Sequence, residues 1–418
     1  MDNLKSKTGD YVRWRTQNVK DALKTRRVVV ISGARQAGKT TLAKQVLDKN
    51  SIFRPLDVDV FYRSAVDDPT GFVKNDNGTM VIDEVQKVKK LITEIKYAVD
   101  NNNRSGQYLL TGSANIFSLP EVSESMAGRV KNIRLRPLTQ GEVLRKKPTF
   151  LKRAFNMDFP KQITGYDKKA IFDLAFRGGF PEVVRLKTQK NRKEWHIDYI
   201  SALLKNDLKD VANISRQDTL KDLIALLAAW SGKFMDISPV CSSLGLSRPT
   251  VVSYINILES LFLFDRLAPW IKTDYDRVGR SYKYYVGDTG FMTAVLGWKQ
   301  EDILLDVDRS GKLMETFVFH ELASQIDLDS SYSLYQYRDR EKREIDFLVE
   351  REDGALIGIE VKASHSVSLG DFSHQKSFRE NILKNKKPYI GLVLYSGEQT
   401  LSFKENFFAV PISVLWSE

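Results

Sequence analysis

One short segment near the amino terminus constrains this chain more than any other. Gly33 to Thr40 read GARQAGKT and satisfy the pattern GxxxxGK[ST]. The run RRVVVIS before them has the composition of a buried strand, and TLAKQVL after them continues as a helix. A glycine-permitted turn between strand and helix lets successive backbone N–H groups surround phosphate oxygens at the positive helix end. The segment therefore predicts a phosphate-binding loop within an α/β domain.

The residues of this loop have expected roles toward a nucleotide. Lys39 would reach the β- and γ-phosphates, and the Thr40 hydroxyl would hold Mg²⁺. No NKxD motif, which reads guanine, occurs in the sequence, so we expect ATP. The remaining loop positions are expected to bind nucleotide beside Lys39 and Thr40, and they are Gly33, Ala34, Arg35, Gln36, Ala37, Gly38 and Thr41.

A second apolar strand supports the same site. Met80-Val81-Ile82 run into Asp83 and Glu84. Asp83 is expected to bind Mg²⁺, directly or through water, and Glu84 to orient or deprotonate the attacking water. After the next strand, Ser113 is placed to sense the γ-phosphate, although a plain Ser/Thr turn explains it equally well. Arg129 is a candidate for a nucleotide contact, here or in a neighbouring subunit, and a surface role remains open.

Composition narrows the class of protein. With 418 residues and domains of about 150 residues, two to four domains are expected. No apolar run approaches the roughly 20 residues of a membrane span, and no secretory signal precedes the first domain. The single cysteine, Cys241, excludes an intrachain disulfide, and a cytoplasmic location without membrane contact is expected. The net charge of +11 suits a polyanionic partner.

The pattern of apolar runs divides the chain into four parts. Residues 1–145 alternate strands and helices, which favours a mostly parallel α/β sheet. Residues 146–217 read as a helical connector. Within 218–298, a helix from Ser238 to Gly245, a second from Ser247 and two strand-like pieces indicate a winged helix-turn-helix. Residues 299–418 return to strands and helices and predict a separate α/β domain.

Several segments give the chain a specific resemblance. They occur in the same order along nearly the whole chain and read GARQAGKTTL, VIDEVQK, LLTGSAN, SMAGR, LRPLTQGEV and RGGFPEVV. The sequence thus resembles the prokaryotic AAA-type ATPases that carry a C-terminal domain of unknown function. This resemblance implies an ATPase core of the AAA+ superfamily, a winged-helix region and a nuclease-like C-terminal domain. Proteins of this type often place catalytic arginines across subunit boundaries, so a homo-oligomer is plausible.

Charged residues near the carboxyl end are similar to the PD-(D/E)XK nuclease signature. Asp346 and Glu360 would bind a second divalent metal, and Lys362 would align the attacking water. Glu315, on the preceding helix, matches the acid that often completes such a site. From the residues alone, an amphipathic hairpin with a charged outer face is an equally good interpretation.

The register of the hairpin tests the metal site. Side chains at i and i+2 share one face of a strand. A two-residue turn at Asp353-Gly354 would put Asp346 and Glu360 on opposite faces. A three-residue loop with a left-handed Gly354 would pair Arg351 with Ala355, and Asp346 with Glu360. We therefore predict a three-residue loop with a bulge, or some other odd register.

These observations favour an ATP-binding and ATP-hydrolysing AAA-type protein. Its nucleotide state would control a winged-helix and nuclease-like module acting on nucleic acid, with DNA favoured. A nucleotide-gated switch that binds DNA or protein through a catalytically inactive C-terminal domain is the alternative. A remodelling ATPase acting on protein is a third possibility. The helix-turn-helix does not decide between them, because its expected recognition face has Arg248 as its one basic residue.

Overall fold

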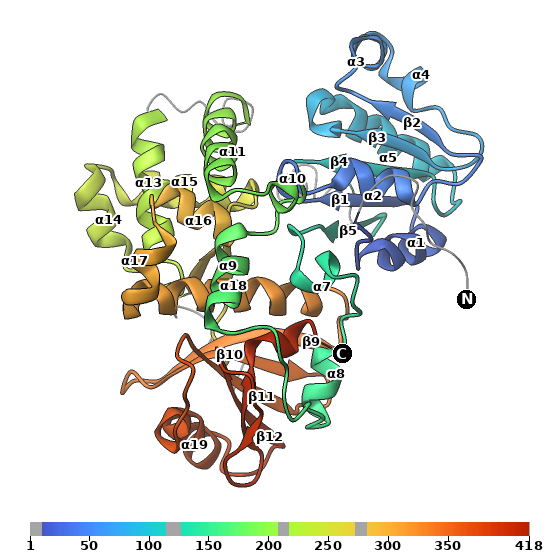
Figure 1. Cartoon of the computed structure of the whole chain (residues 1–418). Helices are drawn as coiled ribbons and strands as arrows, with labels where there is room; N and C mark the ends of the chain where they lie inside the picture. The colour runs from blue at the N-terminus through green and yellow to red at the C-terminus, as the bar shows by residue number, and fades with distance from the viewer. Residues whose placement is uncertain (1–10, 114–125, 127, 208–216, 272–281, 418) are drawn as a thin grey trace. The chain divides into compact units, whose positions relative to one another are not determined.

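The computed structural model describes residues 11–113, 126, 128–207, 217–271 and 282–417. The chain divides into two compact units. The first comprises Met1–Leu138 with Ser260–Leu263, and the second Thr139–Glu259 with Phe264–Glu418. Each unit contains β-sheet and a hydrophobic core of its own (Figure 1).

The first unit is built on a parallel sheet with the strand order β2-β3-β4-β1-β5. Its strands are β1 (Val28–Ser32), β2 (Ile52–Pro55), β3 (Met80–Asp83), β4 (Tyr108–Gly112) and β5 (Val130–Arg134). The helices of this unit are α1 (Thr16–Thr25), α2 (Lys39–Gln45), α3 (Asp59–Asp67), α4 (Pro69–Val73) and α5 (Lys90–Asn101). The predicted parallel α/β sheet is thereby confirmed, whereas the short strands β2 and β5 were not predicted.

Helices cover both faces of this sheet, which explains why β1 is apolar at every position before Ser32. Val28 and Val30 point into a core shared with α4 and α5. Val29 and Ile31 point to the opposite face and pack with α1 and α2. All five residues of β1 are buried, as expected for a strand buried on both faces. Polar residues occur at the carboxyl ends of the strands, such as Ser32 on β1 and Asp83 on β3.

The second unit begins with helices and a small sheet. The helices before the small sheet are α7 (Gln140–Val143), α8 (Phe150–Phe155), α9 (Lys168–Arg177), α10 (Pro181–Arg185), α11 (Gln189–Ala202) and α13 (Gln217–Ala229). The antiparallel sheet has the order β6-β8-β7 and consists of β6 (Lys233–Phe234), β7 (Phe264–Leu267) and β8 (Lys283–Val286).

The predicted helix pair lies between β6 and β7. Helix α14 (Ile237–Leu244) ends at Gly245, whose φ of 61° is a left-handed conformation that glycine adopts without strain. Helix α15 (Arg248–Ser260) follows and buries Val251, Ile255 and Leu258. Most of the polar loop expected between the two strands, residues 272–281, lies outside the described residues.

A six-stranded mixed sheet forms the rest of the second unit, in the order β13-β14-β12-β11-β10-β9. Helix α18 (Val307–Ile326) packs on one face, and the segment around α19 (Ser373–Ser377) on the other. Helices α16 (Thr289–Val295) and α17 (Gln300–Leu305) precede α18. The strands are β9 (Tyr332–Arg338), β10 (Glu344–Arg351), β11 (Leu356–Lys362), β12 (Tyr389–Tyr395), β13 (Leu401–Ser402) and β14 (Phe407–Pro411).

Among the described residues, none of the helices combines the length and the apolar character that crossing a membrane requires.

Candidate nucleotide site and carboxylate cluster

The glycine-rich loop joins the end of β1 to the start of α2, as the motif predicts. Gly33 leaves no space for a side chain, because a Cβ there would lie 2.2 Å from the Leu135 carbonyl oxygen. Gln36 and Gly38 have φ values of 60° and 97°, so the chain turns sharply before α2 begins at Lys39. The Lys39 ammonium is buried and donates to the Ala34 carbonyl oxygen at 3.0 Å. The Lys39 side chain thus folds back onto the phosphate-binding loop itself.

Asp83 lies at the carboxyl end of β3 and meets the loop through Thr40. The Thr40 hydroxyl donates to the Asp83 carboxylate, with Oγ1 3.0 and 2.9 Å from its two oxygens, and Thr111 donates to the same carboxylate. Burial raises the pKa of Asp83, while the two hydroxyl donors oppose that shift. A hydroxyl and a carboxylate in contact are hard oxygen donors of the kind Mg²⁺ prefers. These two residues therefore fit the metal that the motif implies.

Glu84 is held beside this pair by a hydrogen-bonded chain. Its left-handed backbone, with φ 57°, lets its N–H donate to the Thr111 hydroxyl at 3.0 Å. The Gln86 amide donates to the Glu84 carboxylate and, at 2.9 Å, to the Ser113 hydroxyl. Ser113 and Glu84, which were predicted from different strands, thus meet through Gln86, which was not predicted.

Two arginines differ in their relation to the loop. Arg13, which was not predicted, is buried and donates to the Ala37 carbonyl oxygen at 2.7 Å and to that of Arg136 at 2.5 Å. It ties the loop to the segment after β5. Arg129 precedes β5 and therefore lies at the amino end of the sheet, where it pairs with Asp100. The structure does not bring Arg129 to the loop of its own chain, and its contact with a neighbouring subunit stays a prediction.

The C-terminal hairpin has the predicted register. Arg351 and Ala355 pair, Gly354 is left-handed with φ 81°, and Phe347 lies opposite Ile359. The loop is therefore Glu352-Asp353-Gly354, and the register continues toward Asp346 opposite Glu360.

On its other side, β10 carries an irregularity in its pairing with β9 between Ile345 and Leu348. The Asp346 carboxylate accepts the Val361 N–H at 3.0 Å, and the Asp346 and Glu360 carboxyl groups share a hydrogen bond.

A buried lysine from a different sheet enters this cluster. Lys283, on β8, has a 2% exposed side chain, and its ammonium lies 3.0 Å from the Glu315 carboxylate and 3.3 Å from that of Asp346. Tyr285, two residues on, donates to Glu315 at 2.7 Å. Glu315 on α18, Asp346 on β10 and Glu360 on β11 thus lie in one cluster, in which Lys283 contacts the first two. The cation that joins Glu315 to Asp346 belongs to the protein itself.

The electrostatics of the cluster follow from this burial. Burial and the Asp346 charge raise the pKa of Glu315 to about 7, and the same two causes raise that of Glu360 well above its usual range. For Asp346, burial acts in the opposite direction to Lys283 and several hydrogen bonds, which together lower the pKa. Burial also opposes the charged form of Lys283, but Glu315 and Asp346 outweigh it and raise the lysine pKa. One carboxylate and one ammonium thus neutralise each other at the centre.

The cluster as it stands does not fit a divalent metal. Lys283 occupies the space between two of the expected ligands, and within the described part of the chain no group of three His, Cys, Asp or Glu is arranged to hold a metal ion. Lys362, the residue expected to align a water, instead lies 3.5 Å from Asp371. The predicted ligands meet, but they hold an ammonium.

A further buried acid lies where the second unit begins. Glu321, on α18 together with Glu315, is fully buried and accepts the Gln140 N–H at 2.8 Å. Thr139 and Glu142 form a capping box around the same turn. Burial raises the pKa of Glu321 to about 8, with the Gln140 N–H opposing that shift.

Glu321 makes the stability of the second unit depend on pH. Its folded pKa of about 8 exceeds the reference value of 4.5, so folding favours the protonated form. The associated stability is fully present below pH 4.5 and is lost as the pH rises toward 8. Glu321→Gln stays neutral, so its free energy of unfolding should rise relative to wild type across this range by a few kcal/mol, as an order of magnitude. Urea denaturation of both proteins at several pH values measures this difference in the free energy of unfolding. A difference that does not change with pH would contradict the role of Glu321.

Three family models match successive parts of the chain. An AAA domain matches residues 25–144, a domain of unknown function (DUF8612) matches residues 168–302, and another (DUF4143) matches residues 310–415. The first match covers the parallel sheet with its loop and carboxylates. The last covers most of α18 and the mixed sheet.

Similar proteins span nearly the same length. An uncharacterized protein of Mycobacterium tuberculosis is 26% identical over 385 residues, which cover 92% of this chain and 80% of that protein. An uncharacterized protein of Methanocaldococcus jannaschii is 22% identical over 411 residues, covering 94% and 88%. Among solved structures, the Thermotoga maritima RuvB Holliday junction branch migration motor has 18% identity and a TM-score of 0.27, covering 60% of this chain and 87% of that one. This score is too low to indicate a common overall fold.

The matched sequence, the parallel sheet and the loop geometry agree. Residues 25–144 match an AAA domain and form an AAA-like parallel sheet with a P-loop, followed in the chain by a separate domain with a mixed sheet.

Proposed function

We propose that this protein hydrolyses ATP and that its nucleotide state controls a C-terminal module that binds nucleic acid. The observation that carries the ATPase part is the contact of Thr40 with Asp83 beside the loop, with Glu84 next in the chain. Mg²⁺ held by Thr40 and Asp83 would neutralise phosphate charge. Lys39 would bind the β- and γ-phosphates, and Glu84, oriented by Gln86, would accept the proton of the attacking water.

The connections between the two units support control by the nucleotide state. One of these connections, residues 135–139, joins β5 to α7, and the chain also passes between the units on either side of Ser260–Leu263. Arg13 binds both the loop, at Ala37, and the start of this connection, at Arg136. At its other end, Gln140 is bound by Glu321 on α18, the helix that also bears Glu315. A change at the loop thus has a short route toward α18, through the hydrogen bonds of Arg13, residues 136–140 of the chain and the hydrogen bond from Gln140 to Glu321.

A finer division of the second unit belongs to the same proposal. We assign residues 146–217 to a helical connector, 218–298 to a winged helix and 299–418 to a nuclease-like domain. The element order α13, β6, α14, α15, β7, β8, with β8 central in its sheet, supports the winged helix. The hairpin register supports the relation of the last part to PD-(D/E)XK nucleases.

The ammonium of Lys283 favours the catalytically inactive form of this module over the nuclease form. In the competing proposal, Asp346, Glu360 and Lys362 cleave phosphodiesters with a metal also bound by Glu315. That proposal requires Lys283 to leave a position in which it contacts two carboxylates. Binding of nucleic acid without cleavage needs no such movement.

A cleavage assay separates the two forms. Wild type, Lys39→Ala and the double variant Asp346→Ala/Glu360→Ala would be incubated with single- and double-stranded DNA and RNA, with Mg²⁺ or Mn²⁺ and with or without ATP. We expect binding that weakens steeply with salt, because phosphate contacts release counterions, and no cleavage. Cleavage that disappears in the double variant would instead establish the nuclease. Absence of salt-sensitive binding to any nucleic acid would overturn both forms.

A further inference from the structure

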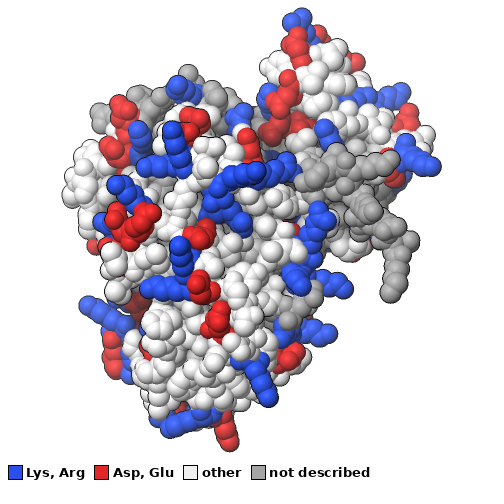
Figure 2. All heavy atoms as spheres, viewed as in Figure 1, with Lys and Arg blue, Asp and Glu red and all other residues white. Residues whose placement is uncertain are grey.

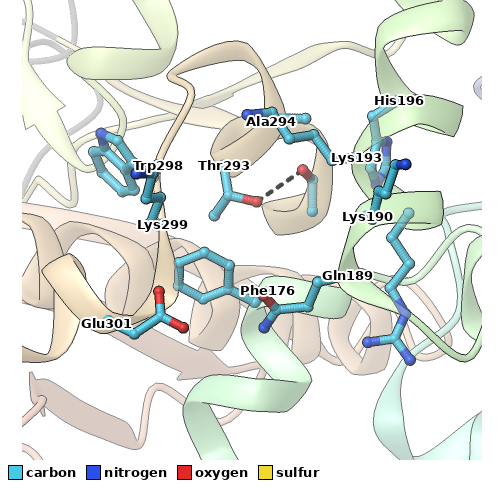
Figure 3. Close-up of a pocket in the computed structure, with 12 residues that line it drawn as sticks. Phe176, Gln189, Lys190, Lys193, His196, Thr293, Ala294, Trp298, Lys299 and Glu301 are labelled. Atoms are coloured by element: carbon cyan, nitrogen blue, oxygen red, sulfur yellow. Dashed lines mark hydrogen bonds between the residues drawn. The ribbon is translucent and has the colours of Figure 1, made fainter.

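A cavity in the second unit lies among α9, α11, α16 and α17 (Figure 3). It has a volume of about 190 Å³. Its wall combines two aromatic side chains, Phe176 and Trp298, with basic side chains that outnumber its one acid, Glu301. The basic residues are Lys190, Arg192, Lys193 and Lys299.

The basic side chains of this cavity differ in whether they form hydrogen bonds or ion pairs within the protein. Arg192 donates to the Leu186 carbonyl oxygen at 3.0 and 2.7 Å, and Lys190 lies 3.9 Å from Glu194. Lys193 and Lys299 are exposed, and neither has a hydrogen bond or ion pair from its side chain to another described residue. In the space-filling view, Lys and Arg side chains stand close together over the region of α10 and α11, with acidic ones among them (Figure 2). Two ammonium groups at the cavity are therefore available to an anion.

The inner wall contains a buried polar ring without a partner. His196 on α11 is 1% exposed, and neither of its ring nitrogens has a hydrogen bond within the part of the chain that is described. Burial lowers the pKa of His196 to about 3, so the ring is neutral. Buried polar groups are normally satisfied, and a ligand is one way to complete such a group. The neutral ring adds no charge, so attraction for an anion comes from the lysines.

From these features we propose that the cavity binds a nucleotide unit, with the base against Phe176 and Trp298 and the phosphate at Lys193 and Lys299. Stacking on aromatic rings beside a cationic track is how proteins bind single-stranded nucleic acid without reading its sequence. The cavity is below the usual size of a site that encloses a whole cofactor-sized ligand, so a single unit suits it better. The unit comes either from a strand or from a free mononucleotide. The first source rests on the proposed function, and the second does not.

The test is fluorescence anisotropy with a labelled single-stranded oligonucleotide, and separately with labelled AMP, on the full chain. Lys193→Ala/Lys299→Ala should weaken oligonucleotide binding about tenfold or more and reduce the slope of log affinity against log salt by about two. Lys384→Ala/Lys386→Ala removes two exposed charges elsewhere in the same unit and should change neither quantity. An oligonucleotide of abasic sites should bind more weakly than the normal strand, because stacking is lost.

The outcomes separate the two sources. If AMP binds and the oligonucleotide does not, with the same dependence on Lys193 and Lys299, the site takes free nucleotides and the nucleic-acid function fails. Equal weakening by both double variants would overturn the cavity assignment while leaving nucleic-acid binding in place. Equally tight binding of poly-glutamate, or binding of neither nucleotide probe, would also overturn it.

Discussion

Glu84→Gln is expected to bind ATP as tightly as wild type and to turn it over about 10²- to 10⁴-fold more slowly, the range for loss of a positioned general base. The geometry gives the reason. The Glu84 carboxylate is held by Gln86 next to Asp83, whereas phosphate binding falls to the loop and Lys39. Glutamine preserves the shape and removes the proton acceptor. Steady-state turnover and equilibrium binding of a fluorescent ATP analogue measure the two effects separately.

Two other substitutions give this prediction its controls. Lys39→Ala should lose both binding and turnover, with turnover lower by about 10²- to 10³-fold as for removal of one preorganised charge donor. Glu94→Gln on α5 changes an acid of the same unit whose carboxylate meets Thr70 rather than the loop, and it should leave turnover unchanged. Full ATPase activity of Glu84→Gln would contradict the role of Glu84 as the proton acceptor.

Lys283→Met is expected to destabilise the second unit by about 3–5 kcal/mol, the cost of leaving a buried charge unpaired. Lys283 is the cation between Glu315 and Asp346, and its side chain is almost wholly buried. Lys233 on the neighbouring strand β6 offers a matched control. Its pair with Asp308, at 2.8 Å, is exposed on both sides, so Lys233→Met should cost about 1 kcal/mol or less. Urea denaturation of the three proteins at one pH makes the comparison.

Adding a divalent metal tests whether Lys283 acts as the cation of the cluster or only fills space in the core. If Lys283 fills a cation position, Mn²⁺ should raise the denaturation midpoint of Lys283→Met and leave that of wild type unchanged. Adding Glu315→Gln to Lys283→Met should recover part of the lost stability, because one of the two acidic groups that Lys283 contacts is then neutral. Binding of Mn²⁺ by wild type that is lost on Asp346→Ala would contradict the assignment and favour the nuclease.

The structural features that could be predicted from the sequence are those that neighbouring residues determine. The loop motif and the apolar run before it predicted β1 and α2, because both are encoded in neighbouring residues. The hairpin register was predictable because only a three-residue loop places Asp346 and Glu360 on one face, and Gly354 can adopt the left-handed conformation that this loop needs. Helix α14 was predictable from the glycine that ends it.

The features that were missed are long-range. Arg13 meets Ala37 across 24 positions of sequence, and Lys283 meets Asp346 across 63, so neither pairing has a local signal. Gln86 was overlooked because a glutamine after an acidic pair has no distinctive pattern, although it stands in the quoted segment VIDEVQK. The placement of Arg129 depends on the direction of β5, a strand that was not predicted. The metal site was predicted without Lys283 for the same reason. The closeness of Asp346 and Glu360 could be predicted from the hairpin, but the presence of Lys283 beside them could not.

The central claim is that the nucleotide state controls nucleic-acid binding by the C-terminal unit. The most direct test compares the affinity of Glu84→Gln for a single-stranded oligonucleotide at one salt concentration with saturating ATP and with ADP. Because this variant should hold ATP without consuming it, each state is fixed during the measurement. We predict affinities that differ by about 5- to 150-fold, the usual range of coupling between two sites. Equal affinities in the two states would contradict the account.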